Sequence, residues 1–192
     1  MDTSTIILIG PEGAGKTTLA TLLSPLLKKS SYELDRHRNE LYSPYGYDKS
    51  AATALWDAHK PDPWPIYRYW KPFEFAAVRH ILSTPSFHDQ ILSFGAGHSI
   101  FENADQLAEV ERLMGRFRNV ILVLPCEDAD EAVGILEKRK GMELPLNKHF
   151  LEHESNRRLA KFTVYTKGKT PEETTKEVLD ILKEDKETRE KE

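Results

Sequence analysis

The chain has 192 residues, and its 39% hydrophobic and 30% charged residues exclude an intrinsically disordered polypeptide. Its formal net charge of −4 provides no overall positive field that would attract nucleic acid or an anionic membrane. The single cysteine, Cys126, excludes an internal disulfide, and no apolar run approaches the roughly 18 residues of a membrane-spanning helix, so we expect one cytoplasmic domain without nucleic-acid or membrane partners.

Short apolar runs alternate with longer segments of helical periodicity along the whole chain. Pro61, Pro63 and Pro65 argue against a regular helix within the aromatic segment 57–70. Residues 183–192 are nearly all charged and predict a charged C-terminal tail in the form of a solvated helix end that frays. In chain order we expect a strand over 5–9, a helix over 17–29, a short strand over 31–34, a helix over 73–82, a strand over 90–94, a helix over 104–117, a strand over 119–124, a helix over 128–140, a strand over 162–165 and a last helix that begins at Pro171 after its capping residue Thr170.

The alternation of strands and helices predicts an α/β fold in which helices cover both faces of a parallel, five-stranded sheet. Ligands of such folds bind at the carboxyl ends of the strands. The loops that begin at Gly10, Asp35, Gly95 and Pro125 follow predicted strands, so we expect them to line one crevice. Residues 1–182 would form this single domain.

A glycine-rich segment follows the first predicted strand. Residues 10–17 read Gly-Pro-Glu-Gly-Ala-Gly-Lys-Thr and match the phosphate-binding pattern G-x-x-x-x-G-K-[ST] in full, between a buried strand and a helix as the pattern requires. In such loops the backbone N–H groups and the helix N-terminus meet the phosphate oxygens. We therefore expect ATP with Mg²⁺ to bind here, with Lys16 at the β- and γ-phosphates and the Thr17 hydroxyl on the metal ion. The nucleotide contacts in this loop would be Gly10, Glu12, Gly13, Ala14, Gly15, Lys16, Thr17 and Thr18.

Five features, in the same order along the chain, resemble the shikimate kinases and their small-molecule kinase relatives. They are the phosphate-binding loop, Glu33-Leu34-Asp35, Trp70-Lys71-Pro72-Phe73-Glu74, Gly95-Ala96-Gly97 after the third strand, and the final strand, loop and helix over 160–173. The three middle segments are similar to the family's Asp-x-Asp, Phe-Arg-x-x-Glu and Gly-Gly-Gly motifs. The resemblance covers residues 5 to about 182 and implies a three-layer P-loop kinase fold, with a short lid over about 139–148 and an acceptor-binding region over about 35–80.

The resemblance implies catalytic roles for Lys16, Asp35 and Arg139. Asp35 would accept a hydrogen bond from the acceptor hydroxyl and orient or deprotonate it, a task that suits a carboxylate at a strand end beside the γ-phosphate. The alternative is that Asp35 caps the helix that follows it. Glu33 would lie near Mg²⁺ through a water molecule, while Thr17 binds the ion directly.

On the nucleotide side, the resemblance implies that Arg139 acts from the lid. It would neutralise developing charge and pack on the adenine ring, which Lys169 and Pro171 flank. The family's second lid arginine has no counterpart at the similar position of this sequence. Arg157 and Arg158 are the candidates to replace it.

On the acceptor side, the resemblance implies that Lys71 faces an anionic group such as a carboxylate, although a lysine cannot bind it in the bidentate manner of the family's arginine. The backbone N–H groups of Gly95, Ala96 and Gly97 would face the acceptor, and His98 would contact it or assist proton transfer. The alternatives are a solvated lysine at the start of a helix and a histidine that serves only the loop.

The residues expected to bind the acceptor depart from the family's pattern more than those expected to bind the nucleotide. By its spacing from Ala160, His153 stands at the position of an arginine with which the family binds its substrate. The aromatic side chains of residues 57–70 offer flat apolar faces for a sugar or another ring substrate, or else they close the core over a long loop. We therefore predict ATP-dependent transfer of the γ-phosphoryl group to a hydroxyl of a small metabolite or antibiotic-like molecule, by a monomer or homodimer. The alternatives are a nucleoside or nucleotide kinase and an ATP-binding regulator without a small acceptor.

Overall fold

Five parallel strands form the central sheet, in the order β2-β3-β1-β4-β5. The structure is a computed structural model, and it describes residues 1–189. Leu8 lies opposite Ser93 on one side and Ile121 on the other, so the loops that leave β1, β3 and β4 start at the same edge. The predicted α/β fold with a parallel five-stranded sheet is confirmed. The strands are β1 Asp2–Ile9, β2 Ser31–Glu33, β3 Ile91–Ser93, β4 Phe117–Leu124 and β5 Phe162–Tyr165.

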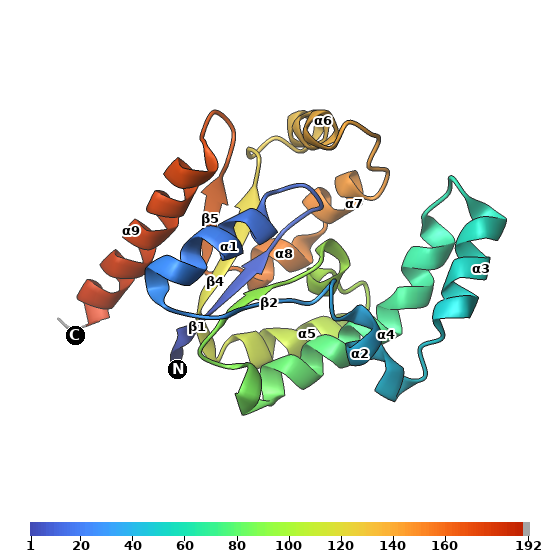
Figure 1. Cartoon of the computed structure of the whole chain (residues 1–192), viewed down its shortest axis with the longest axis horizontal. Coiled ribbons are helices and arrows are strands. Elements are labelled where there is room, and N and C mark those ends of the chain that lie inside the picture. The colour runs from blue at the N-terminus through green and yellow to red at the C-terminus, as the bar shows by residue number, and fades with distance from the viewer. Residues whose placement is uncertain (190–192) are drawn as a thin grey trace.

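Helices cover both faces of this sheet (Figure 1). Helices α1 (Lys16–Leu27) and α9 (Pro171–Arg189) contact each other on one face. On the other face, α5 (Ala104–Met114) packs between α4 (Trp64–Ser83) and α8 (Glu154–Leu159). The strands between these layers are buried on both sides, which is why β1 and β4 are nearly continuous apolar runs.

Further helices and single turns surround this three-layered core. Figure 1 shows α3 far from the sheet, where it packs against α4, whereas α6 and α7 lie together near the loop between β1 and α1. These elements are α2 Arg38–Tyr42, α3 Lys49–His59, α6 Ala129–Lys140 and α7 Asn147–Glu152, with 3₁₀ turns at Ser43–Tyr45, Pro85–Phe87 and Ala96–Ser99.

The segment 57–70 is largely helical, so the prediction of an irregular segment there is wrong. Helix α4 begins at Trp64 instead of Phe73. Pro65 lies in the first turn of α4, where backbone N–H groups have no partner within the helix. A proline there therefore costs no intrahelical hydrogen bond. Pro72 lies inside α4 and removes one hydrogen bond, but burial of the apolar face of the helix outweighs that loss.

Other boundaries also differ from the prediction, since β1 begins at Asp2 instead of Thr5 and β4 begins at Phe117 instead of Asn119. The helix expected over 104–117 ends at Met114, because Phe117 is buried as the first residue of β4. Helix α9 continues to residue 189, which agrees with the helix end expected after residue 182, and residues 190–192 lie outside the described part of the chain. Among residues 1–189, none of the helices has both the length and the apolar character that crossing a membrane demands.

Candidate active site

The loop between β1 and α1 turns sharply at glycines. Gly10 has a φ of +136°, and a Cβ atom there would lie 2.3 Å from the carbonyl oxygen of Val123, so only glycine fits. Gly13 and Gly15 also have left-handed φ values, +78° and +99°. The first N–H groups of α1 have no partner within the helix, and this is the geometry that binds phosphate oxygens.

Lys16 is the first residue of α1 and is buried at this loop. Its Nζ donates to the carbonyl oxygens of Gly10 and Pro11, both at 2.8 Å. Burial lowers the pKa of Lys16 from 10.5 to about 8, against the opposing effect of the negative charges of Asp35 and Glu12. An anion bound in the loop would therefore favour the charged form of the amine.

A cavity of about 610 Å³ opens between the glycine loop and α4. Lys16, Thr17, Glu33 and Asp35 line it on one side, and Glu74 of α4 lines it on the other. The cavity lies where the chain leaves the carboxyl ends of β1, β2 and β3, which is the edge at which such sheets bind ligands. The glycine loop and the carboxylate of Asp35 therefore face one common space.

The two residues predicted to hold a metal ion lie side by side in this cavity. The hydroxyl of Thr17 donates to Oε2 of Glu33 at 3.2 Å. Hydroxyl and carboxylate oxygens suit Mg²⁺, which usually keeps several waters and is bound through one or two protein groups together with substrate phosphates. This pair therefore fits the ion that accompanies a nucleotide.

Asp35 is held tightly at the end of β2. Its Oδ1 accepts a hydrogen bond from Nη2 of Arg38 at 2.8 Å, and a Cβ atom on Gly95 would lie 2.3 Å from the same oxygen. Burial by itself would raise the pKa of this carboxyl, but the imidazole of His98 and the positive charges of Arg38 and Lys16 lower it, and the net shift is downward. The capping residue of α2 is His37, and no side chain caps that helix, so the alternative role of Asp35 as a helix cap is wrong.

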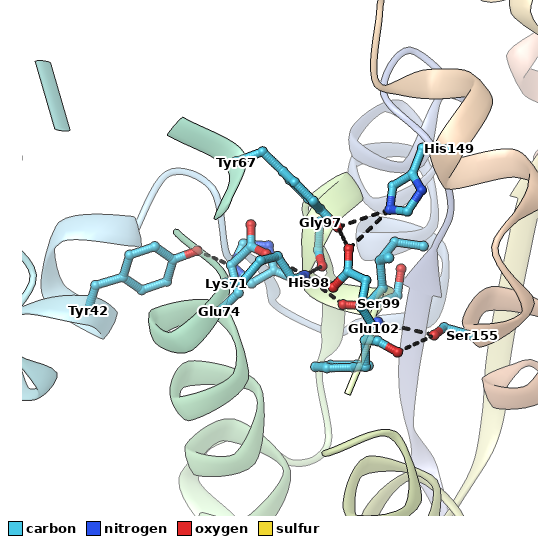
Figure 2. Close-up of polar contacts among 12 residues, drawn as sticks. Tyr42, Tyr67, Lys71, Glu74, Gly97, His98, Ser99, Glu102, His149 and Ser155 are labelled. Carbon is cyan, nitrogen blue, oxygen red and sulfur yellow. Dashed lines mark hydrogen bonds and ion pairs between the residues drawn. The ribbon is translucent and has the colours of Figure 1, made fainter. Parts of the chain in front are cut away.

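Lys71 is engaged by the protein itself (Figure 2). Its Nζ donates to Oε2 of Glu74 at 2.8 Å and to the carbonyl oxygens of Gly97 and Ile100 at 2.7 and 2.6 Å. An ammonium group has three N–H donors, so all of them are used. Glu74 lines the cavity, but Lys71 does not, so the structure does not bring the predicted anion-binding lysine to the cavity wall.

Aromatic rings and one arginine form the rest of the wall near α4. Tyr67, Trp70 and Phe150 line the cavity, and the guanidinium of Arg38 lies 4.2 Å from the centre of a Trp70 ring. No motif in the sequence marks Arg38 as a residue of this site. Its only signal is the spacing of three residues from Asp35, which permits an ion pair at the start of a helix.

A second cavity, of about 260 Å³, adjoins the glycine loop on its other side. Arg139, Lys169 and Pro171, the residues expected around adenine, all line it. Arg139 donates to Oγ1 of Thr166 at 2.9 Å, which holds the guanidinium there and not in the first cavity. The cation from the same segment that does line the first cavity is Lys140.

The segment after α6 is tied to the glycine loop by contacts that sequence reasoning missed. The buried side chain of Asn147 accepts from the backbone N–H of Glu12 at 3.1 Å and donates to the Glu12 carbonyl at 3.0 Å. Lys140 adds an ion pair with the Glu12 carboxylate at 3.1 Å. Asn147 and Glu12 are 135 residues apart in the chain, and no sequence motif marks such a pair.

The remaining candidates divide between the cavity and other places. Ala96 and Gly97 line the first cavity, whereas His98 is fully buried. His153 caps α8, since its Nδ1 accepts from the backbone N–H of Ser155 at 3.2 Å. Arg158 pairs with Glu111 and does not line the cavity, so it is not a substitute for a lid arginine in this arrangement.

Comparison with known proteins shows which solved structures share the fold of this chain. No protein-family model matches the chain, and no curated protein matches it. The chain is similar to the structure of shikimate kinase from Acinetobacter baumannii in complex with shikimate, with a TM-score of 0.63 and 18% identity over 95% of this chain and 94% of that one. It is similar to shikimate kinase from Bacteroides thetaiotaomicron, with a TM-score of 0.60 and 16% identity over 93% and 98% of the two chains.

A gluconokinase from Sinorhizobium meliloti 1021 has the same architecture, with a TM-score of 0.53 and 12% identity over 96% of this chain and 94% of the gluconokinase. At these identities the likeness establishes the fold. The chain has the three-layered P-loop kinase fold, and the resemblance drawn from its sequence motifs is confirmed at that level.

Proposed function

We propose that the chain is a small-molecule kinase that transfers the γ-phosphoryl group of ATP to a hydroxyl group of its acceptor. The observation that carries this proposal is the common cavity of Lys16 in the glycine loop and Asp35 at the end of β2. A phosphoryl donor in the loop and a hydroxyl beside the carboxylate would share one cavity, as transfer between them requires.

The residues of the loop have distinct tasks in this function. Lys16 would exchange its two carbonyl partners for phosphate oxygens and stabilise their charge. Thr17 and Glu33 would hold Mg²⁺, which supplies further charge neutralisation to the phosphates when it is bound. The second cavity, with Arg139, Lys169 and Pro171 on its wall, would take the adenine ring.

Asp35 would orient the acceptor hydroxyl and accept its proton. Its lowered pKa keeps the carboxyl ionised at neutral pH, so it accepts hydrogen bonds. Arg38 donates a hydrogen bond to the carboxylate of Asp35, and Gly95 packs against the same carboxylate. These two contacts fix its orientation, so it is preorganised for that role.

We assign the acceptor-binding region to residues 35–80 and the lid to residues 139–148, within a domain of residues 1–182. Lys140 and Asn147, near the two ends of the lid, contact Glu12 in the glycine loop. A movement of this loop on nucleotide binding would therefore move the lid through these contacts. Closure of such a segment excludes water from the reacting groups.

The acceptor we favour is a hydroxylated molecule with an apolar ring face that does not depend on Lys71. All three donors of Lys71 are used by the protein, so an acceptor carboxylate would have to displace one of them. Tyr67, Trp70 and Phe150 provide apolar faces of the kind that pack on sugar rings.

An ADP-release assay over a panel of sugars, hydroxy acids, nucleosides and nucleoside monophosphates tests the proposal. We expect ADP release with a hydroxylated small molecule, and a loss of at least about a hundredfold in Lys16→Ala, as for removal of one electrostatic stabiliser. Activity with nucleosides or nucleoside monophosphates alone would make the chain a nucleoside or nucleotide kinase. ATP binding without transfer to any acceptor would favour a regulatory protein.

A further inference from the structure

His98 lies on the 3₁₀ turn after β3, and none of it is exposed. Its Nε2 is 2.8 Å from the phenolic oxygen of Tyr42, a contact drawn in Figure 2. Its Nδ1 is buried without a hydrogen-bond partner and lies 3.9 Å from Oδ1 of Asp35. Buried polar atoms in folded proteins nearly always have partners, so this unpaired nitrogen needs an explanation.

The neighbours of the two ring nitrogens decide which of them carries the proton. An ionised carboxylate only accepts hydrogen bonds, so the nitrogen that faces Asp35 is favoured as N–H. Tyr42 then donates its O–H to the lone pair of Nε2. Burial lowers the pKa of His98 and raises that of Tyr42, so both groups are uncharged near neutral pH. Arg38 and Lys16 are therefore the lasting positive charges around Asp35.

Arg38 and His98 both face the same oxygen of Asp35. Arg38 donates to Oδ1 at 2.8 Å, and Nδ1 of His98 lies 3.9 Å from the same oxygen, which is beyond hydrogen-bond distance. Hydrogen bonds at catalytic sites are often long before the substrate binds and shorten in the complex. Two donors on Oδ1 would leave Oδ2 for the acceptor hydroxyl.

We propose that His98 is a positioning residue for Asp35: its Nδ1–H donates to Oδ1 when the acceptor binds, and Tyr42 holds the imidazole in the tautomer that can do so. The inference rests on the proposed function, because it takes Asp35 as the group that orients the acceptor hydroxyl. The charged groups that act on His98 from the surrounding elements are Glu74 and Asp35, which favour the imidazolium, and Arg38 and Lys71, which oppose it.

Two substitutions of His98 separate the roles of its two nitrogens. In His98→Asn the amide nitrogen takes the place of Nδ1 and keeps the donor toward Asp35. In His98→Gln the amide oxygen takes the place of Nε2 and accepts from Tyr42, so the partner of Tyr42 is kept and the donor toward Asp35 is lost. We expect His98→Gln to lower kcat by about tenfold to a hundredfold at unchanged KM for ATP, and His98→Asn to stay within about threefold of the parent chain. Equal losses in the two variants would overturn the proposal.

The tautomer can be tested without any acceptor. Nitrogen-15 NMR of the whole parent chain should find His98 in the Nδ1–H form, and Tyr42→Phe should shift it toward the Nε2–H form. An Nε2–H form in the parent chain would overturn the inference, whatever the activity. If the parent chain phosphorylates no acceptor but His98 is in the Nδ1–H form, the proposed function fails while the predicted contact stands.

Discussion

Gly95 and Asp35 approach each other so closely that a Cβ atom on Gly95 would lie 2.3 Å from Oδ1 of the carboxylate. Gly95 follows β3 and Asp35 follows β2, and these strands are neighbours in the sheet. The absence of a side chain on one strand end therefore sets the position of the carboxylate on the next.

Gly95→Ala should displace Asp35 and lower kcat by at least about tenfold, because a shift of one ångström at a reacting group is costly. ATP binding should be unchanged, since Gly95 does not line the second cavity, which we propose takes the adenine ring. Gly134→Ala is the matched control, because nothing lies within 4 Å of a Cβ atom there. Steady-state kinetics measure kcat and ATP titrations measure the affinity of both variants. An equal loss of kcat in the two variants would show that the contact between Gly95 and Asp35 is not the cause.

Asp35→Asn should leave ATP binding intact and lower phosphoryl transfer by at least about a hundredfold, as expected when a general base is lost. The amide keeps the size of the side chain but cannot take the proton. Single-turnover transfer from labelled ATP measures the effect. Unchanged turnover would refute the role of Asp35.

The affinity for ATP should fall as the pH rises through about 8, the pKa to which burial lowers Lys16. Phosphates raise the pKa of the amine in the complex, so binding above that pH must take up a proton, whereas below it the amine is already charged. Calorimetric titrations in buffers of different ionisation enthalpy measure the proton uptake. Lys16→Met should abolish this dependence, and a flat affinity in the parent chain would contradict it.

Asn147→Ala should destabilise the chain by about 1–3 kcal/mol, because it leaves two backbone groups of Glu12 without partners. Asn147→Asp should have an intermediate effect, since its carboxylate accepts from the Glu12 N–H but cannot donate to the carbonyl. Denaturant unfolding with and without ATP checks both. A neutral Asn147→Ala would show that the lid is not tied to the loop in solution.

Much of the fold and the nucleotide half of the site could be predicted from the sequence, because their signals are local. The glycine loop is one contiguous run of eight residues with a required backbone shape, and the strands are continuous apolar runs. The resemblance to the small-molecule kinases singled out Glu33, Asp35, Arg139, Lys169 and Pro171, and each of them lines one of the two cavities.

The acceptor half could not be predicted in the same way. Three prolines argued against a helix over 57–70, yet α4 starts there, because Pro65 falls in its first turn and tertiary burial decides the rest. Lys71 looked like an anion ligand, but Glu74 and two carbonyl groups use its donors.

The sequence by itself determined the strand and helix pattern, the phosphate-binding loop and the charge of the chain, since each depends on neighbouring residues or on a sum over all of them. Only the tertiary structure decided that Arg38 covers Trp70, that His98 is buried behind Asp35, and that Asn147 holds Glu12. Those contacts join residues from different elements, and their partners are chosen by the packing of helices on the sheet, which no short segment encodes.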